Sequence, residues 1–282
     1  MKTILVTGSN GQVGWELQRS LAPLGKIVAF ERSRLDLSDA DAIRREIRLV
    51  SPDIIVNAAA YTAVDQAESD TELAMLINGR APGVIAEEAK KLGALLLHYS
   101  TDYVFDGAKS GPYSEADQPR PVNVYGRSKL AGEQAVQACG CRHLIFRTCW
   151  VYGGHGKNFL RTMQRLAREQ EQLAVVDDQI GAPTWSRMIA EASALALRGD
   201  PAPGLYHLSC AGQTSWHGFA QAILAAQGWR GSVRAIRSRD YPLPAQRPAN
   251  SLLDSAKLAA QLGLALPDWR HALGLCLADA PA

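Results

Sequence analysis

A glycine-rich turn near residue 8 constrains the fold more than any other feature of this sequence. An apolar, β-rich run at residues 3–7 precedes the turn, and a helical pattern at residues 12–22 follows it. Glycines at three-residue intervals permit a tight turn in which a pyrophosphate approaches the backbone and the positive helix N-terminus. Because the spacing is G-x-x-G-x-x-G rather than G-x-G-x-x-G, a plain strand-to-helix turn is the alternative. The residues predicted to bind a dinucleotide here are Gly8, Asn10, Gly11, Gln12, Val13 and Gly14.

Apolar runs alternate with amphipathic segments through the first half of the chain. Such alternation is typical of βαβ units, and nearly continuous apolar runs indicate strands covered by helices on both faces. The expected strands are residues 3–7, 26–30, 54–57, 94–99 and 143–147. The expected helices between them are residues 12–22, 39–50, 81–92 and 124–138, with Ser38 as the N-cap of the second and Gly93 as the C-cap of the third. The sequence therefore predicts an α/β fold with a Rossmann-type, doubly wound parallel sheet.

The pattern changes after Trp150. Helices are expected at residues 159–170, 185–197 and 216–226, and prolines become frequent. We expect residues 1–150 to form a dinucleotide-binding domain. Residues 151–282 are expected to form a smaller, mostly helical substrate lobe that is partly interleaved with the sheet.

Charge and cysteine content exclude several classes of partner. Lysine and arginine number 30 and aspartate and glutamate 28, for a net charge of +2, which disfavours a nucleic-acid-binding protein. No uncharged apolar stretch approaches the ~20 residues that span a bilayer, and the first residues are expected to form a strand rather than a signal peptide. The five cysteines are an odd number without C-x-x-C pairs, so reduced thiols are expected. We expect a cytoplasmic protein with no nucleic-acid or membrane partner.

The segments after the second and third strands supply further candidate cofactor contacts. An acidic residue about 20 positions beyond the glycine turn meets the adenosine ribose in dinucleotide-binding folds, and Glu31 is in register for this role. Arg32 follows it and could hold a 2′-phosphate, so the choice between NADH and NADPH stays open; a surface ion pair is the alternative. Asp36 and Leu37 could flank the adenine. Small residues after the third strand would admit the cofactor near the backbone, and the candidates there are Ala58, Ala59, Ala60, Tyr61 and Thr62.

Tyr125 and Lys129 form a candidate catalytic pair. Their i, i+4 spacing places both side chains on one face of a predicted helix. A nearby ammonium group favours the phenolate, so Lys129 is expected to lower the pKa of Tyr125 toward the working range. Ser100 or Thr101, at the end of the preceding strand, could donate a hydrogen bond to a reacting carbonyl oxygen. An amphipathic helix with an incidental tyrosine and lysine is the alternative.

These motifs together resemble the extended short-chain dehydrogenases/reductases. More specific segments resemble the dTDP-4-dehydrorhamnose reductase family from residue 1 to about residue 270. They are Gly11–Leu17, Val56–Asp65, His98–Phe105, Asn123–Gly126, Phe146–Tyr152, Asp178–Thr184 and Arg247–Ser251.

The resemblance implies reduction of the C4 ketone of dTDP-4-dehydro-β-L-rhamnose with NADPH or NADH, the last step of dTDP-rhamnose biosynthesis. It implies that Tyr125 protonates the nascent alkoxide, that Lys129 holds the nicotinamide ribose and that Thr101 binds the substrate oxygen. Asp102 and Trp150 would fix the sugar, although core packing is the alternative for Trp150. The other implied substrate contacts are Asp178, Gln179, Pro183, Thr184 and, for the diphosphate, Arg247, for which a solvated arginine is the alternative.

The resemblance also bears on metal binding and on the oligomeric state. Some members are associated with Mg²⁺ that joins two subunits through carboxylates, and Glu16 is a candidate ligand here. Arg187 would repel a cation and only Glu191 lies near it in the sequence, so a metal-bridged dimer is not expected, and monomer and homodimer both stay open. Two rival functions are a reductase or epimerase of another nucleotide sugar and a non-catalytic, cofactor-binding regulatory subunit.

Overall fold

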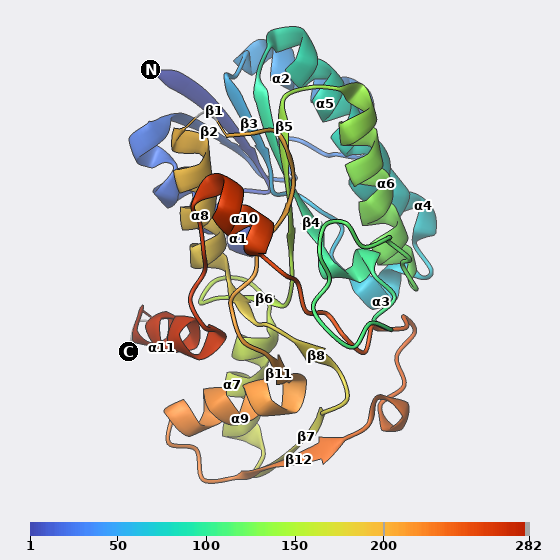
Figure 1. Ribbon diagram of the computed structural model, residues 1–282, viewed down its shortest axis with the longest axis vertical. Helices are drawn as coiled ribbons and strands as arrows, with labels where there is room; N and C mark the ends of the chain where they lie inside the picture. Colours follow the sequence, from blue (N-terminus) through green and yellow to red (C-terminus); the bar gives the residue numbers. More distant parts are fainter. Residues whose placement is uncertain (200, 280–282) are drawn as a thin grey trace.

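A six-stranded parallel sheet forms the centre of the molecule (Figure 1). The structure is a computed structural model that describes residues 1–199 and 201–279. The strand order is β10-β5-β4-β3-β1-β2. The strands are β1 (Lys2–Thr7), β2 (Gly25–Phe30), β3 (Ile54–Asn57), β4 (Leu95–Thr101), β5 (His143–Thr148) and β10 (Gly204–His207). β1 has β2 on one side and β3 on the other, so the order of the strands across the sheet reverses next to β1. Ligands of open α/β sheets bind outside the carboxyl ends of the strands at such a reversal.

Helices cover both faces of this sheet, as Figure 1 shows. One face carries α2 (Ala40–Val50), α5 (Ala81–Leu92) and α6 (Val124–Cys139), and the other carries α1 (Gln12–Ser20), α8 (Ser186–Arg198) and α10 (Ala256–Leu262). Side chains alternate between the two cores along each strand, so Leu5 and Ile55 are buried in one core and Ile4 and Val56 in the other. These observations confirm the predicted α/β class.

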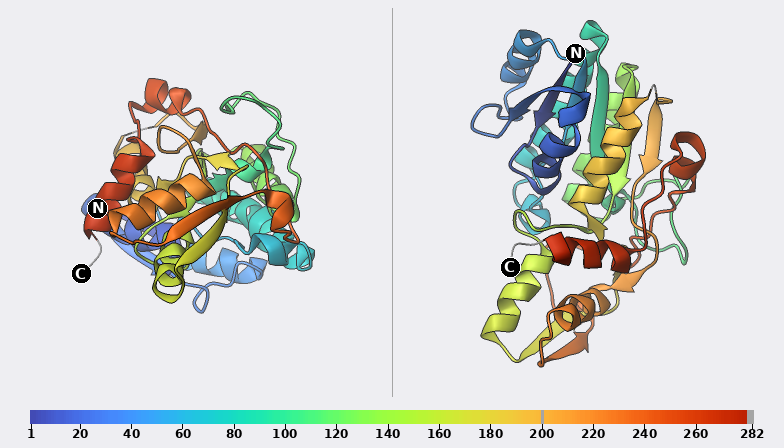
Figure 2. Two further views of the ribbon diagram at one scale, coloured as in Figure 1. Left: turned by 90° about the horizontal axis from the view of Figure 1, so that it is seen from below. Right: turned by 90° about the vertical axis from the view of Figure 1, so that its left-hand side faces the viewer.

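The remaining elements lie beyond the carboxyl ends of the strands and form a lower layer (Figure 2). Its largest fully buried side chains include Tyr152, Phe219 and Trp269. The short strands are β6 (Val151–Tyr152), β7 (Gln172–Val176), β8 (Ile180–Gly181), β9 (Thr184–Trp185), β11 (Thr214–Ser215) and β12 (Ser232–Ile236). The helices are α7 (Phe159–Glu169), α9 (Trp216–Ala226) and α11 (Trp269–Asp279). This lower layer faces the edge of the sheet where a bound dinucleotide would lie.

Three features differ from the sequence expectations. Asp39, rather than Ser38, caps α2, because its carboxylate accepts from the amides of Asp41 and Ala42 while Ser38 bonds to Asp36. The sixth strand, β10, was not expected. Residues 64–80, also not expected to be helical, form α3 (Val64–Ala67), α4 (Thr71–Ala74) and the π-helix η2 (Met75–Arg80). The short 3₁₀ helices are η1 (Ala22–Leu24), η3 (Asp102–Val104) and η4 (Ser238–Asp240).

Within residues 1–199 and 201–279, no helix combines the length and the apolar character that crossing a bilayer requires.

Candidate active site

The glycine turn packs directly on the backbone that follows β3. Gly8 has a φ of +68°, and a Cβ there would lie 2.7 Å from the Ala59 Cα. A Cβ at Gly14 would overlap the carbonyl of Gly8, so both positions require glycine. Gly11 is the N-cap of α1, and no side chain of the described residues forms a capping hydrogen bond with the first amides of that helix. The first amides of α1 are therefore available to an anion, which is the geometry predicted for this turn.

A segment after β6, which sequence reasoning missed, lies against the same turn. The His155 ring is 2.9 Å from the Asn10 carbonyl, to which its Nε2–H donates, and it stacks on Trp15 at 4.2 Å. Gln12 donates through Nε2 to the Val151 carbonyl at 3.4 Å. The Gln12 Oε1 is buried and has no partner among the described residues. Val13, also predicted to contact the cofactor, packs partly buried against the sheet core.

The charged residues after β2 lie beside the turn. The Ser9 amide donates to the Phe30 carbonyl at 3.1 Å, which brings the end of β2 next to the glycines. The exposed Glu31 accepts from the hydroxyl of Ser33, and Arg32, also exposed, is 3.8 Å from Asp36. Hydrogen bonds from Ser38 hold the pKa of Asp36 below its ordinary value. Leu37, by contrast, is buried in the core. The adenosine-binding roles of these residues stay predictions.

Buried polar side chains join three strands under the turn. Thr7 donates to Asn57 at 2.7 Å, and Asn57 donates through Nδ2 to His98 Nδ1 at 3.1 Å. Burial holds the pKa of His98 well below its ordinary value, so the imidazole is neutral at neutral pH. The Ala59 amide donates to the same Thr7 hydroxyl at 3.3 Å. This network, unforeseen from the sequence, holds the small-residue segment against the glycine turn.

The small-residue segment itself is anchored at Tyr61. Asn78 accepts from the Tyr61 amide at 2.8 Å and donates to its carbonyl at 2.9 Å. The Tyr61 hydroxyl donates to Asp70 at 2.9 Å. Ala58, Ala60 and Thr62, the other residues predicted to contact the cofactor there, are half-buried or exposed.

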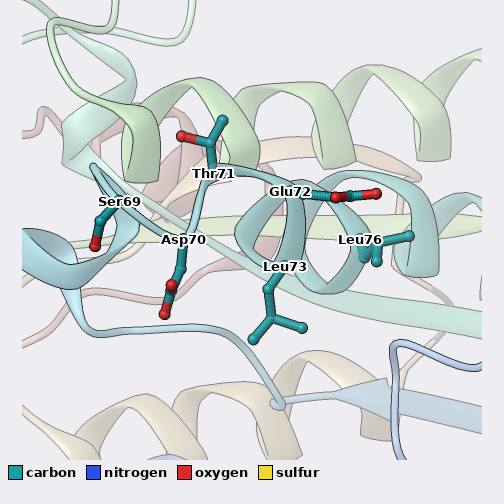
Figure 3. Close-up of a pocket in the computed structure, with 6 residues that line it drawn as sticks. All are labelled: Ser69, Asp70, Thr71, Glu72, Leu73 and Leu76. Atoms are coloured by element: carbon teal, nitrogen blue, oxygen red, sulfur yellow. The ribbon is translucent and has the colours of Figure 1, made fainter.

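A surface pocket of about 390 Å³ lies beside this anchor, at the start of α4 (Figure 3). Figure 3 shows its side chains fanning away from one another rather than converging on a point. Asp70, which lines the pocket, already accepts a hydrogen bond from Tyr61, so its carboxylate serves to anchor the small-residue segment.

The three predicted catalytic residues meet at the carboxyl end of β4. Asn123 caps α6 by accepting from the Gly126 amide at 2.7 Å, so Tyr125 and Lys129 lie in the first turns of that helix. Lys129 is buried and donates through Nζ to the Tyr99 carbonyl on β4 at 2.6 Å. Thr101 is a close enough neighbour of Tyr125 to act on the pKa of its hydroxyl. The structure therefore brings a phenol hydroxyl, a threonine hydroxyl and a buried cation together.

Asp102 lies beside these groups. The Thr101 hydroxyl donates to its Oδ1 at 2.9 Å, whereas its buried Oδ2 has no hydrogen-bond partner among the described residues. Burial raises the pKa of Asp102 to about 6, against the opposing effects of Ser251 and Thr101.

The protonation of Tyr125 differs from the sequence hypothesis. Burial raises its pKa to about 12, and Asp102 adds to that rise while the hydrogen bond with Thr101 opposes it. Burial also lowers the pKa of Lys129 to about 8, although Glu133 acts in the opposite direction. The expectation that the pKa of Tyr125 lies toward neutrality is therefore wrong for this structure, because burial outweighs the groups that favour the phenolate and the Lys129 ammonium group donates to the Tyr99 carbonyl. A protonated tyrosine is nevertheless the form that can give up a proton during a reduction.

The residues predicted to contact substrate are found in three different environments. Trp150 has a φ of +47° and is buried by stacking on Trp216 at 3.6 Å; Gly181 lies so close to its ring that a Cβ would overlap it. Gln179 bridges Trp216 and Ser238, and Ser238 also bonds to Asp178. Thr184 is fully buried, and its hydroxyl is bonded to Ala182 and Cys210, so this structure gives it a packing role.

Arg247 is only partly exposed, and a carboxylate already binds it. Its guanidinium forms a two-pronged ion pair with Asp65, at 2.9 and 2.6 Å. Asp65 belongs to α3 on the sheet side of the molecule, whereas Arg247 comes from the segment after β12, which passes beside α3 in Figure 1.

The candidate metal ligand Glu16 also has a cationic partner. Arg187 lies between two carboxylates, at 3.1 Å from Glu16 and 2.7 Å from Asp279, and so ties α8 to α1 and α11. Among residues 1–199 and 201–279, histidine, cysteine and acidic side chains do not gather in a group that could hold a metal ion. The guanidinium stands where a cation bridging these carboxylates would have to be, so the residues do not fit a Mg²⁺ site.

We accordingly expect metal removal to have no effect. Dialysis against EDTA should leave both the rate of cofactor oxidation and the thermal unfolding midpoint unchanged, because Arg187 already neutralises Glu16 and Asp279. Loss of activity on EDTA treatment that added Mg²⁺ restores would contradict this expectation.

Comparisons with known proteins match almost the whole length of the chain. The family model of the RmlD substrate binding domain matches residues 1–281. The dTDP-4-dehydrorhamnose reductase of Burkholderia thailandensis is 53% identical, and the match covers 98% of this chain and 98% of the relative. That of Escherichia coli K12 is 47% identical and covers 95% of this chain and 94% of its own. The structure of dTDP-4-dehydrorhamnose reductase from Bacillus anthracis in complex with NADP superposes with a TM-score of 0.96 at 35% identity, covering 99% of both chains.

Proposed function

Because this chain belongs to the RmlD substrate binding domain family, we propose that it reduces the C4 ketone of dTDP-4-dehydro-β-L-rhamnose to dTDP-L-rhamnose. The observation that carries the proposal is the meeting of Thr101, Tyr125 and Lys129 at the carboxyl end of β4. A nicotinamide cofactor, NADPH or NADH, supplies the hydride that adds to the carbonyl carbon. The chain's own residues have to bind the ketone oxygen and protonate it.

Thr101 and Tyr125 are suited to that task because their side chains are neighbours at the end of β4. A ketone oxygen placed between them accepts a hydrogen bond from Tyr125 and, once the Thr101 hydroxyl turns from Asp102 toward it, a second one from Thr101. Both hydrogen bonds strengthen as negative charge develops on the oxygen. Tyr125 then transfers its proton to the alkoxide, and the resulting phenolate lies on the same helical face as the Lys129 ammonium group. Lys129 stabilises that phenolate after transfer, although burial keeps Tyr125 protonated beforehand.

The remaining roles follow the environments of the side chains. The amides of α1, with Gly11, Gln12 and Val13, bind the pyrophosphate. Asp102, whose Oδ2 has no hydrogen-bond partner among the described residues, is suited to accept from a sugar hydroxyl. Trp150 is held in place by its stack on Trp216. Glu31 favours NADH through ribose hydroxyls, whereas Arg32 favours NADPH, so both cofactors enter the test.

A spectrophotometric assay tests the function. Purified protein should oxidise NADPH or NADH only when dTDP-4-dehydro-β-L-rhamnose is present, and the product should be dTDP-L-rhamnose. Turnover of a different nucleotide sugar, with none of this one, would transfer the activity to another reductase or epimerase. Cofactor binding without turnover of any nucleotide sugar would favour a regulatory protein.

The pH dependence of kcat/KM should report Lys129. Its pKa is lowered to about 8, so the ammonium form is lost as pH rises through about 8, while Tyr125, with a pKa of about 12, stays protonated. Activity should therefore fall with a midpoint near pH 8. In Lys129→Arg the guanidinium stays charged past that range, and the alkaline decline should disappear from whatever activity is retained. An unchanged decline in Lys129→Arg would assign it to another group.

A further inference from the structure

A cluster of contacts around Arg247 connects the segment after β12 to the catalytic end of α6. Besides its two bonds to Asp65, the guanidinium donates to the Ala245 carbonyl at 3.0 Å, and the Ala245 amide donates to Asp65 at 3.2 Å. The side chain of Arg247 is 18% exposed and that of Asp65 36%. The carboxylate thus binds both the side chain and the backbone of one short segment, which fixes its position relative to α3.

The same segment holds the residue that starts the catalytic helix. Asn123 donates through Nδ2 to the Gln246 carbonyl at 2.8 Å, while its Oδ1 caps α6 at Gly126. The next amide, that of Val124, donates to Glu68 at 2.7 Å, just beyond α3. Both attachments lie within two residues of Tyr125. Displacement of segment 245–247 would therefore loosen the turn that carries the proton donor.

Arg247 also lies near Tyr103, which packs against Tyr125. Burial lowers the pKa of Arg247, but its hydrogen bonds to Asp65 and the electrostatic effect of Tyr103 outweigh burial and raise that pKa. The Tyr103 ring lies edge-on to the Tyr125 ring, with centroids 5.8 Å apart and planes at 78°. The Tyr103 amide in turn donates to the Thr101 hydroxyl at 3.1 Å. The guanidinium is thus connected to both residues that contact the ketone oxygen in the proposed function.

We propose that Arg247, locked by Asp65, is a positioning residue that sets the orientation of Tyr125 rather than a ligand of the substrate diphosphate. This inference rests on the proposed function only for its kinetic readout. The guanidinium already donates three hydrogen bonds, two to the Asp65 carboxylate and one to the Ala245 carbonyl, so these donors could turn to a phosphate only if the Asp65 pair broke. Breaking that pair would release Tyr103 and the start of α6 at the moment when Tyr125 has to be aligned.

The two roles predict opposite kinetics for Asp65→Asn. If Arg247 is a positioning residue, Asp65→Asn and Arg247→Gln should each lower kcat by roughly 10-fold or more, since small displacements of a catalytic group are costly. The KM for the dinucleotide should not change, and the double variant should be no worse than either single variant, because both remove one shared interaction. If Arg247 binds the diphosphate, Asp65→Asn should free it and lower the KM for the nucleotide sugar, which would overturn the proposal.

A second readout does not depend on turnover. Amide hydrogen exchange in residues 101–104 and 123–127 should become faster in Asp65→Asn, while the strands of the sheet keep their protection. Glu169→Gln is the matched control, since it breaks the exposed Arg165–Glu169 pair and should change neither kcat nor exchange near α6. Unchanged exchange around Tyr125 would overturn the positioning role even if no sugar were turned over, which separates it from a failure of the proposed function.

Discussion

Replacing Tyr125 with phenylalanine should lower kcat by about 10²- to 10⁴-fold, the range typical for loss of a positioned general acid. The substitution removes the proton donor and keeps the ring that packs against Tyr103. Dinucleotide binding should persist, because the glycine turn and the Lys129–Tyr99 contact do not involve the Tyr125 hydroxyl. Stopped-flow or steady-state oxidation of NADPH measures the first effect, and fluorescence titration with the cofactor measures the second.

Tyr152→Phe is a matched control for this substitution. Its buried hydroxyl has no partner among the described residues, so its removal should leave kcat unchanged. Full activity in Tyr125→Phe would show that another group protonates the alkoxide. Equal losses in Tyr125→Phe and Tyr152→Phe would indicate a general effect of removing a buried hydroxyl.

Replacing Arg147 with methionine should lower the free energy of unfolding by about 3 to 5 kcal/mol, the cost of leaving one member of a buried ion pair alone. Arg147 on β5 makes a two-pronged pair with Glu133 on α6, at 2.8 and 2.6 Å, and both side chains are almost completely buried. The guanidinium also lies over the Phe105 ring, 5.0 Å from its centroid. The methionine variant leaves the Glu133 carboxylate buried without its partner.

Urea denaturation measures this loss, and two variants calibrate it. Arg165→Met breaks an exposed i, i+4 pair with Glu169 and should cost less than about 1 kcal/mol. The double variant Glu133→Leu/Arg147→Met should recover much of the stability, because two apolar side chains replace the pair without leaving a buried charge. A loss below about 1 kcal/mol in Arg147→Met would show that Glu133 is neutralised by other means.

Local patterns were sufficient for much of the fold and for part of the site. The glycine spacing, the continuous apolar runs and the Tyr125–Lys129 interval each depend on residues within a few positions of one another. The expected helices and strands of residues 1–150 are present, although Asp39 rather than Ser38 caps α2. Sequence reasoning missed β10 because a four-residue run is a weak signal, and its identity as a strand depends on pairing with β5.

The partners of charged and polar side chains could not be predicted in the same way. Nothing near Arg247 in the sequence indicates Asp65, which is 182 positions away, and nothing near Arg187 indicates Glu16, 171 positions away. Thr184 resembled a substrate contact by its motif, but packing buries it completely.

The sequence by itself determined the parallel α/β class, the position of the glycine turn, and the Tyr125–Lys129 spacing on which the proposed function relies. These follow from short-range sterics and periodicity, which act between neighbours in the chain. Only the tertiary structure decided that Asp65 forms an ion pair with Arg247 and that Arg187 forms one with Glu16. It also decided that burial keeps Tyr125 protonated and lowers the pKa of Lys129 to about 8. Ion pairing and desolvation depend on which surfaces the fold brings together, and spacing along the chain does not encode them.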